Sequence, residues 1–511
     1  MLLGDETGAS VQLRRSDDLR LRLKPIAWPA IAPLVVAKVV LQLVTADLYG
    51  AHRDEFYYLA SGHHPAWGYV DNPPLVPMLY RLQEAVLGHS VTALALVPAL
   101  VGGVFIVLGA LIARELGGGP FAQGLTGVVA MLGPLYLTTS HFLSTVSLDL
   151  VFWALGSWLV LRMVRTQDRR LWAVVGVVCG VGLLNKDTMG FWTVSAVLGL
   201  ACTPQRKLLA GRWLLVGAGA ALVIVAPNLI WEAANHWPTL EFLRNITAGN
   251  GRSNVVQFVP FQLVLVTLGG TVIWVTALMA MGRRTEFRDQ RWLLVAYLVS
   301  FLLLLALEGK AYYLGSWYLP LVAVGAVAIE QRWHRLARYG VLGVVVVTGL
   351  TLAPEATPIL PESTAVALHL DTVNPDLGGM LGWPQVVAEI ADVFHSLPTG
   401  EQPRAVVLTG NYAEAGAVDF YGPERGLTHA ISGQNSFWLW GYGDPSPGAT
   451  VVAVGLPSAF VHRYWGAVTR AVIVGNGPVP IDPHERGRVV WICRRQRLPW
   501  SVLWPRTKHY D

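Results

Sequence analysis

The sequence predicts a polytopic α-helical membrane protein that ends in a small α/β domain. The first observation is the composition: 53% of the 511 residues are hydrophobic and only 14% are charged, whereas a soluble protein carries about 25% charged residues. The second is a series of apolar runs long enough to cross a bilayer, and the third is a change to short alternating runs after residue 355. Together they exclude a soluble enzyme, and they also exclude a disordered chain, because disorder requires low hydrophobicity and high net charge.

Eleven apolar runs approach the roughly 20 residues that a helix needs to cross a bilayer. They lie near residues 26–46, 91–113, 121–139, 147–164, 171–184, 188–203, 213–231, 261–281, 292–307, 314–330 and 338–354. A basic leader, residues 1–25, precedes the first run, which is too long for a cleavable signal peptide, so we expect a retained anchor. With the leader in the cytoplasm, the inner segments hold 20 Lys and Arg residues and the outer segments up to residue 354 hold six. This asymmetry follows the positive-inside rule and predicts a cytoplasmic N-terminus and an external C-terminal domain.

The same map divides the chain into parts. Residues 26–354 form the predicted membrane domain, with external loops at 47–90 and 232–260, and residues 355–511 form the external domain. In that domain, alternating apolar residues predict strands at 405–409, 450–455, 470–474 and 488–493, and helical patterns lie near 412–421 and 457–466. The net charge of +5 would suit nucleic acid, but the basic residues sort by membrane side, so no nucleic-acid partner is expected.

The first external loop carries the residues with the most chemistry. Asp54 comes soon after the first predicted helix, so its carboxylate should lie near the outer interface, where electrostatic interactions are stronger than in water. There it could accept a proton from an attacking hydroxyl, a role typically worth about 10²–10⁴ in rate. Asp71 is the second acid of the loop. The alternative is that both acids only cap short helices within the loop.

A metal site in the first loop is a further alternative. His63, His64 and Asp71 offer ligand types that a divalent metal accepts. Adjacent histidines rarely point to one centre, however, so the pattern favours anchoring of the loop at the membrane interface. No metal or other cofactor is assigned.

Cations are scarce on the outer side, and two lysines stand at helix ends there. Lys186 lies in the turn between the fifth and sixth predicted helices, and Lys310 follows the ninth. An ammonium in this place could hold a phosphate through up to three hydrogen bonds; the alternative is that each lysine only snorkels outward. Arg244 and Arg252, in the second loop, could meet an anionic headgroup. Lys38, inside the first run, could line an internal cavity, but its place about nine residues before Asp47 favours snorkelling toward the outer face.

The first loop also contains a fairly specific pattern. It consists of Asp54-Glu55 and, further on, Gly68-Tyr69-Val70-Asp71-Asn72-Pro73-Pro74. Supporting motifs are Asn185-Lys186, Pro227-Asn228-Leu229-Ile230-Trp231, Asn235-His236-Trp237-Pro238 and Gly309-Lys310-Ala311-Tyr312-Tyr313. Over roughly residues 30–330 the chain resembles the polytopic glycosyltransferases of the GT-C type, specifically glycosyltransferase family 39. That family includes protein O-mannosyltransferases and the aminoarabinose transferases that modify lipid A.

The resemblance implies the GT-C fold, a catalytic role for Asp54 and a second acid at Asp71. Lys186 and Tyr312 or Tyr313 fall where relatives contact the lipid phosphate. The loop residues expected to support the site are Glu55, Tyr57, Tyr69, Asn72, Pro73 and Pro74. One departure concerns Asn72: lipid A aminoarabinose transferases carry a lysine immediately before the Pro-Pro pair, so one phosphate contact is missing or replaced in this chain.

The predicted activity is transfer of a sugar from a polyprenyl-phosphate donor to an acceptor hydroxyl on the external face of a bacterial cytoplasmic membrane, with inversion. The predicted partners are this donor and membrane lipid. The acceptor stays open among protein, glycan, lipid and small metabolite, and the C-terminal domain is expected to take part in choosing it. Two other functions also stay open. A transporter or flippase would place ionisable residues near the bilayer midplane, often in repeated halves, and a scaffold would need no acid-rich loop.

Overall fold

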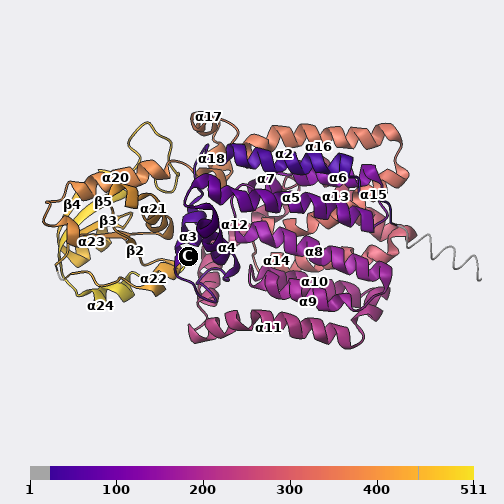
Figure 1. Ribbon diagram of the computed structural model, residues 1–511, viewed down its shortest axis with the longest axis horizontal. Helices are drawn as coiled ribbons and strands as arrows, with labels where there is room; N and C mark the ends of the chain where they lie inside the picture. Colours follow the sequence, from indigo (N-terminus) through magenta and orange to yellow (C-terminus); the bar gives the residue numbers. More distant parts are fainter. Residues whose placement is uncertain (1–22, 447) are drawn as a thin grey trace, which may run out of the picture.

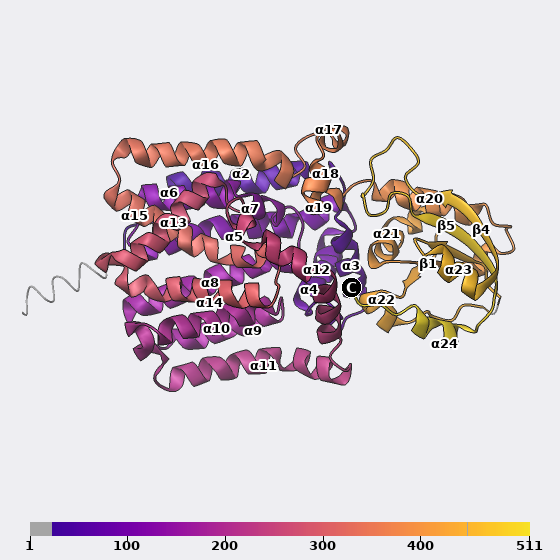
Figure 2. The same ribbon diagram turned by 180° about the vertical axis from the view of Figure 1, so that it is seen from behind.

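The computed structural model describes residues 23–446 and 448–511. Most of the predicted basic leader, residues 1–25, lies outside the described residues. A long bundle of helices forms one end of the molecule, and a smaller domain built on a sheet forms the other (Figure 1). Between them lie α3 (Arg53–His63), α4 (Leu75–Leu87) and α12 (Pro238–Gln262), as both views show (Figures 1 and 2).

Each of the eleven predicted apolar runs coincides with helical structure in the bundle. The helices are α2 (Trp28–Thr45), α5 (Val91–Glu115), α6 (Pro120–Leu132), α7 (Pro134–Thr138), α8 (Thr145–Thr166), α9 (Leu171–Leu183), α10 (Thr188–Ala201), α11 (Arg212–Ala234), α13 (Leu268–Arg283), α14 (Arg291–Ala306), α15 (Tyr318–Arg332) and α16 (Arg335–Ala356). The connecting turns are η1 (Pro204–Leu209), η2 (Thr285–Gln290) and η3 (Ala311–Trp317). Among the described residues, seven helical segments are long and apolar enough to cross a membrane, and four shorter apolar helices accompany them. The prediction of a polytopic helical membrane domain is confirmed.

The predicted second external loop, residues 232–260, is mostly helical in the structure. Helix α11 continues to Ala234, and α12 occupies most of the remainder. Pro238 stands in the first turn of α12, where its missing N–H leaves no helical hydrogen bond unmade, and the next proline is Pro260. The run predicted at 261–281 accordingly starts late, because α12 extends to Gln262 and α13 begins only after its N-cap, Thr267.

Lys38 does not snorkel to the outer face as predicted, because the bundle offers its ammonium a polar site. The residue is completely buried, and its Nζ donates to the carbonyls of Met131 (3.2 Å) and Tyr136 (2.9 Å). The helix breaks between α6 and α7 at Gly133 and Pro134, and proline has no N–H with which to continue the helical ladder. Lys38 therefore satisfies the Met131 carbonyl inside the membrane domain and shares the Tyr136 carbonyl with the Ser140 hydroxyl.

The C-terminal domain follows three short helices, α17 (Glu362–Ala367), α18 (Leu370–Val373) and α19 (Pro375–Gly378). Its sheet has the order β2-β1-β3-β5-β4, in which β1 is parallel to β2 and β3, and β5 is antiparallel to β3 and β4. The strands are β1 (Val406–Thr409), β2 (Ala430–Ser432), β3 (Val451–Val454), β4 (Trp465–Ile473) and β5 (Val489–Gln496). The four predicted strands overlap β1, β3, β4 and β5.

The helices of this domain cover both faces of the sheet (Figure 1). The two predicted helices match α21 (Tyr412–Tyr421) and α23 (Ser458–Tyr464). The sequence patterns do not predict β2 or the helices α20 (Trp383–His395), α22 (Asn435–Trp440) and α24 (Trp500–Leu503). Short 3-10 turns are η4 (Gln402–Arg404), η5 (Pro423–Arg425) and η6 (Trp504–Arg506).

Alternate residues of the strands face two different hydrophobic clusters. Leu408 and Val451 pack with α23 and α24 on one face. Val407 and Val452 face the other way, into a cluster that also contains side chains of α20, α21 and α3. Phe56 of α3, for example, makes an edge contact with Trp383 of α20, with ring centroids 5.7 Å apart. We call this cluster the shared core, because the first loop and the C-terminal domain both contribute to it; its members include Phe56, Tyr57, Trp383, Val387, Phe394, Val407 and Val452.

Candidate active site

The N-terminus of α3 places two acids at the end of the bundle that faces the C-terminal domain. The helix is capped by His52, whose Nδ1 accepts from the Asp54 N–H (3.2 Å), while the Glu55 carboxylate accepts from the His52 N–H (2.8 Å). This capping box leaves the Asp54 carboxylate without a capping role. Helix α4 begins after Pro74 without a side-chain cap, so Asp71 does not cap it either. The alternative that both acids serve only as helix caps is therefore wrong.

Asp54 is an accessible carboxylate. Its side chain is 34% exposed, and its Oδ1 accepts a hydrogen bond from the Tyr412 hydroxyl (2.8 Å). The nearest basic atoms are His52 Nδ1, 3.9 Å from Oδ2, and Arg53 Nε, 4.0 Å from Oδ1. Burial raises the pKa of Asp54, but His52, Arg53, the Tyr412 hydrogen bond and the charge of Lys310 outweigh burial, and the pKa is lowered. Asp54 is thus ionised and suited to accept a proton.

Asp71 is the second acid of the first loop, and its pKa is shifted in the opposite direction from that of Asp54. Its Oδ1 accepts from the Tyr57 hydroxyl (2.5 Å). Burial raises the pKa of Asp71 to about 7; the Tyr57 hydrogen bond opposes this rise and the negative charge of Asp54 adds to it. The pKa values of the two acids are therefore pushed apart, so that near neutral pH Asp54 is ionised while about half of Asp71 is protonated. Paired carboxyls with separate catalytic roles typically show this difference.

Lys186 and Lys310 lie at the same end of the bundle, each against a tyrosine ring. Lys186 Nζ is 4.8 Å from the centroid of the Tyr313 ring, and Lys310 Nζ is 5.8 Å from that of Tyr312. Both distances fall within the range of a cation–π interaction. Lys186 Nζ also donates to Thr145 Oγ1 (3.2 Å). These contacts hold the two ammonium groups in place and leave donors free for an anion.

The charges of these lysines act on the acids. Burial lowers the pKa of Lys186 to about 8, while Asp149 and Asp54 raise it and Lys310 lowers it further. Lys310 in turn lowers the pKa of Asp54. Asp54 is thus coupled to both lysines and to Asp71, and we call these four titratable groups the acid–lysine cluster: Asp54, Asp71, Lys186 and Lys310.

Helix α12 carries the two arginines predicted to meet a headgroup. Arg244 and Arg252 are both exposed, and α12 packs against η3, the turn that carries Tyr312 and Tyr313. Glu241 of the same helix pairs with Lys508 of the C-terminal domain (2.9 Å), but neither arginine has an ion-pair partner among the described residues. Both arginines lie on the helix that packs against η3, but neither has an ion-pair contact with the acid–lysine cluster.

The remaining loop residues hold the turn between α3 and α4. The Tyr69 hydroxyl donates to the Ser61 carbonyl (2.7 Å), and the Tyr69 N–H donates to the Asn72 carbonyl (3.0 Å). Asn72 Nδ2 donates to the Pro73 carbonyl (3.0 Å). Tyr69, Asn72, Pro73 and Pro74 are all buried. They shape the loop from within.

The three residues considered as metal ligands do not converge. His63 Nε2 lies 2.6 Å from Glu84 Oε2. His64 stacks on Trp440, with ring centroids 4.2 Å apart, and Asp71 bonds to a tyrosine hydroxyl instead. No group of three potential ligands occurs within residues 23–446 and 448–511. The two histidines instead contact α4 and the C-terminal domain.

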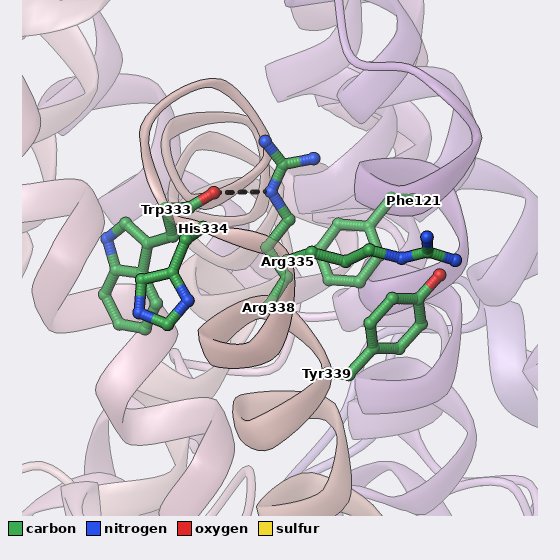
Figure 3. A pocket seen from close by; sticks show the side chains of 6 residues that line it. All are labelled: Phe121, Trp333, His334, Arg335, Arg338 and Tyr339. Carbon is green, nitrogen blue, oxygen red and sulfur yellow. Dashed lines mark hydrogen bonds between the residues drawn. The ribbon is translucent and has the colours of Figure 1, made fainter.

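Two hollows in the described part of the chain differ in the residues that line them. One of about 470 Å³ opens beside the first loop and is lined by His63, His64, Pro65, Ala66, Gly68, Tyr69, Trp231, Asn235, Ser436, Leu439 and Trp440. The other, of about 320 Å³, lies at the far end of the bundle and is lined by Phe121, Trp333, His334, Arg335, Arg338 and Tyr339 (Figure 3). The second lining contains no carboxylate, and Arg335 and Arg338 point in different directions (Figure 3). Of these two hollows, the first is the one lined by residues of the first loop, which carries Asp54 and Asp71.

Two residues of the C-terminal domain contact Asp54 or the tyrosine that bonds to Asp71, and the sequence does not predict either. Tyr412, which bonds to Asp54, follows β1 at the start of α21. Its position at the carboxyl end of a parallel strand is a signal that could have identified it, because ligands of α/β sheets bind there. Ser436, whose Oγ lies 2.8 Å from the Tyr57 hydroxyl, has no such local signal, since 379 positions separate the two residues.

Known proteins share both the sequence pattern and the fold. Residues 71–231 match the family described as dolichyl-phosphate-mannose-protein mannosyltransferase. The lipid A galacturonosyltransferase RgtD of Rhizobium johnstonii is 23% identical over 356 residues, which cover 66% of this chain and 72% of the relative. An undecaprenyl phosphate-alpha-4-amino-4-deoxy-L-arabinose arabinosyl transferase of Pseudomonas savastanoi pv. phaseolicola is 25% identical over 189 residues, 36% of this chain and only 34% of the relative.

Crystal structures of ArnT from Cupriavidus metallidurans share the architecture of the whole chain. The apo structure matches with a TM-score of 0.57 at 16% identity, covering 90% of this chain and 97% of that one. The structure bound to undecaprenyl phosphate matches with a TM-score of 0.54 at 16% identity, covering 91% and 98%. The chain is therefore a polytopic membrane protein of GT-C architecture with paired acids at one end of its bundle. Fold and relatives together make it a GT-C membrane glycosyltransferase.

Proposed function

We propose that the protein transfers a sugar from a polyprenyl-phosphate donor to a hydroxyl group of a lipid acceptor. The relatives are named for lipid A and for undecaprenyl phosphate, and the ArnT structure holds undecaprenyl phosphate. The observation that carries the proposal is the acid–lysine cluster, in which an ionised, accessible carboxylate lies in the electrostatic range of two lysines backed by tyrosine rings. A carboxylate base for the acceptor hydroxyl and cations for the leaving phosphate are the groups that this reaction needs.

Asp54 acts as the general base. The acceptor oxygen attacks the anomeric carbon from the side opposite the phosphate, and its proton passes to the Asp54 carboxylate. The bond between the anomeric carbon and the phosphate oxygen breaks, and its electron pair remains on the phosphate. The configuration at the anomeric carbon is inverted by this single displacement.

The two lysines stabilise the leaving phosphate. Positioned cations act where negative charge develops, and they are most effective in a site that excludes water. Lys186 and Lys310 serve this role, with Tyr312 and Tyr313 holding their ammonium groups. A polyprenyl phosphate needs no general acid to leave, so the protonated state of Asp71 serves to avoid a second negative charge beside the donor.

The exposed arginines of α12 extend the same surface. Arg244 and Arg252 lie on the helix that packs against η3, and we assign them to the approach of the anionic donor headgroup. Guanidinium groups suit this role because they bind phosphate oxygens in a bidentate manner.

We place the acid–lysine cluster and the C-terminal domain on the external side of the membrane, with the N-terminus in the cytoplasm. The support is the charge at the opposite end of the bundle, which carries an excess of basic residues, as cytoplasmic ends do. These include Arg165, Arg169, Arg170, Arg206, Lys207, Arg283, Arg284, Arg335 and Arg338. The bacterial relatives are consistent with a cytoplasmic membrane.

The test is release of free polyprenyl phosphate by the purified full-length protein in lipid nanodiscs. A panel of polyprenyl-phosphate sugars serves as donors and a cell-envelope lipid extract as the acceptor. We expect turnover with one donor and its loss in Asp54→Asn. Binding of donors without turnover of any of them would instead favour a transporter or a scaffold.

A further inference from the structure

We propose that the C-terminal domain completes the active site, with Tyr412 and Ser436 as positioning residues for the two acids of the first loop. The inference rests on the proposed function and assigns two further residues to the same site. It gives the domain a part in the chemical step, separate from any part in choosing the acceptor.

Tyr412 fixes the Asp54 carboxylate. It is the first residue of α21, whose start is held by a capping box in which Asn411 Oδ1 accepts from the Glu414 N–H (2.7 Å). The Tyr412 ring packs on Tyr57 with centroids 4.9 Å apart, and its hydroxyl donates to Asp54 Oδ1 (2.8 Å). Within the described residues, Asp54 Oδ2 has no hydrogen-bond donor. The bond at Oδ1 therefore sets the rotation of the carboxylate and leaves the other oxygen for an acceptor hydroxyl.

Ser436 fixes the second acid through Tyr57. The serine is completely buried in the first turn of α22, and its Oγ accepts from the Val70 N–H (3.0 Å). Its own N–H donates to the Tyr57 oxygen (3.3 Å), and Tyr57 in turn donates to Asp71 Oδ1 (2.5 Å). One residue of the C-terminal domain thus joins α3 to the turn that carries Asp71.

Close packing keeps these contacts in register. A Cβ atom on Gly416 of α21 would come within 2.7 Å of the Phe56 Cβ, so the two helices approach as closely as glycine allows. Beside them, Arg53 Nη1 lies 3.7 Å from the buried Asp482 and 3.2 Å from His484 Nδ1. The residue that precedes Asp54 is therefore paired with the C-terminal domain as well, and a shift of the domain would move the Asp54 carboxylate.

The test uses Tyr412→Phe, which keeps the ring and removes the hydroxyl. Because a hydrogen bond to a charged group is lost, we expect kcat to fall about 10-fold with an unchanged KM for the donor. The acidic limb of the pH–rate profile should move to higher pH, because the lost bond favoured the ionised form of Asp54. Ser436→Ala provides a second variant, with an expected loss of about fivefold. Tyr442→Phe is the control, because Tyr442 stacks on Trp500 at the far side of the sheet.

A double-mutant cycle separates positioning from a general loss of structure. In the Asp54→Asn background, removal of the Tyr412 hydroxyl should cost little further, since the group through which it acts is already gone. Wild-type kcat and an unshifted pH profile in Tyr412→Phe, or a full additional loss in the Asp54→Asn background, would overturn the inference while the proposed function stands. A wild-type protein without turnover of any donor would refute the proposed function itself, and the inference with it.

Discussion

Replacement of Asp54 by asparagine separates catalysis from folding with unusual clarity. The substitution keeps the shape of the side chain, and its amide oxygen can still accept the hydrogen bond that Tyr412 donates over 2.8 Å. The cap of α3 is made by His52 and Glu55, so it is unaffected. The loss of a negative charge in the first helical turn costs about 0.3–1 kcal/mol. We therefore expect a folded protein with nearly unchanged thermal stability.

The rate of sugar transfer should fall far more than the stability of the Asp54→Asn protein does. A general base contributes about 10²–10⁴ in rate, which corresponds to about 3–5.5 kcal/mol of transition-state stabilisation. The remaining cluster, with Lys186 and Lys310, still binds the donor phosphate, so the loss should appear in kcat and leave the KM for the donor nearly constant. The assay is release of polyprenyl phosphate under single-turnover conditions, with melting temperature in the same nanodiscs as the folding check.

Glu55→Gln provides a matched control. Glu55 is the adjacent acid, but it is buried and its carboxylate bonds to the His52 N–H and the Tyr80 hydroxyl. We expect this variant to lose about 1 kcal/mol of stability through a weakened cap and to retain kcat. An Asp54→Asn protein with more than a tenth of wild-type kcat, or a Glu55→Gln protein with an equal loss of kcat, would refute the assignment of the base.

Three further predictions concern pH and the buried lysine. Burial raises the pKa of Asp71 to about 7, so as pH rises through about 7 it ionises beside Asp54 and transfer should fall; Asp71→Asn should remove this part of the pH–rate profile, and an unchanged profile would contradict the assignment. Burial lowers the pKa of Lys186 to about 8, so its ammonium should lose its charge above that pH and the donor KM of the wild-type protein should rise there. The KM of Lys186→Arg should not change at that pH, and Lys186→Ala should raise KM about 10-fold at all pH values. Lys38→Met should lower stability in detergent by about 2 kcal/mol, because the buried Met131 carbonyl loses its side-chain donor and the Tyr136 carbonyl keeps only the Ser140 hydroxyl. Val40→Met, at a half-exposed position of the same helix, should not lower it.

The membrane part of the fold follows closely from hydropathy, because each buried or lipid-facing helix must be apolar over most of its length. Hydropathy does not predict helix α12, because its sequence between Pro238 and Gln262 mixes polar and apolar residues. The position of Lys38 also depends on information that its own helix does not contain. Its partners are exposed by a break in another helix, 93 and 98 positions further along the chain.

The candidate site could be predicted as far as membrane topology brings residues together. Asp54, Lys186 and Lys310 stand at helix ends at one end of the bundle, so the predicted order of membrane crossings is enough to bring them together. Tyr412 is 358 positions from Asp54, and only the docking of a separate sheet domain onto α3 brings them into contact. Sequence periodicity reports which face of an element is apolar, but it carries no information about which polar residue of one domain will meet which residue of another.

The shared core of the first loop and the C-terminal domain also determines which pieces of this protein can be exchanged with relatives. A chimera that takes only residues 355–511 from another transferase would set foreign side chains against Phe56 and Tyr57, which belong to the cluster that holds the sheet. We expect such a chimera to fold poorly, and one that transfers residues 47–90 together with the C-terminal domain to fold well. In this architecture, a change of substrate preference would then require both segments to change together, although they are distant in the gene.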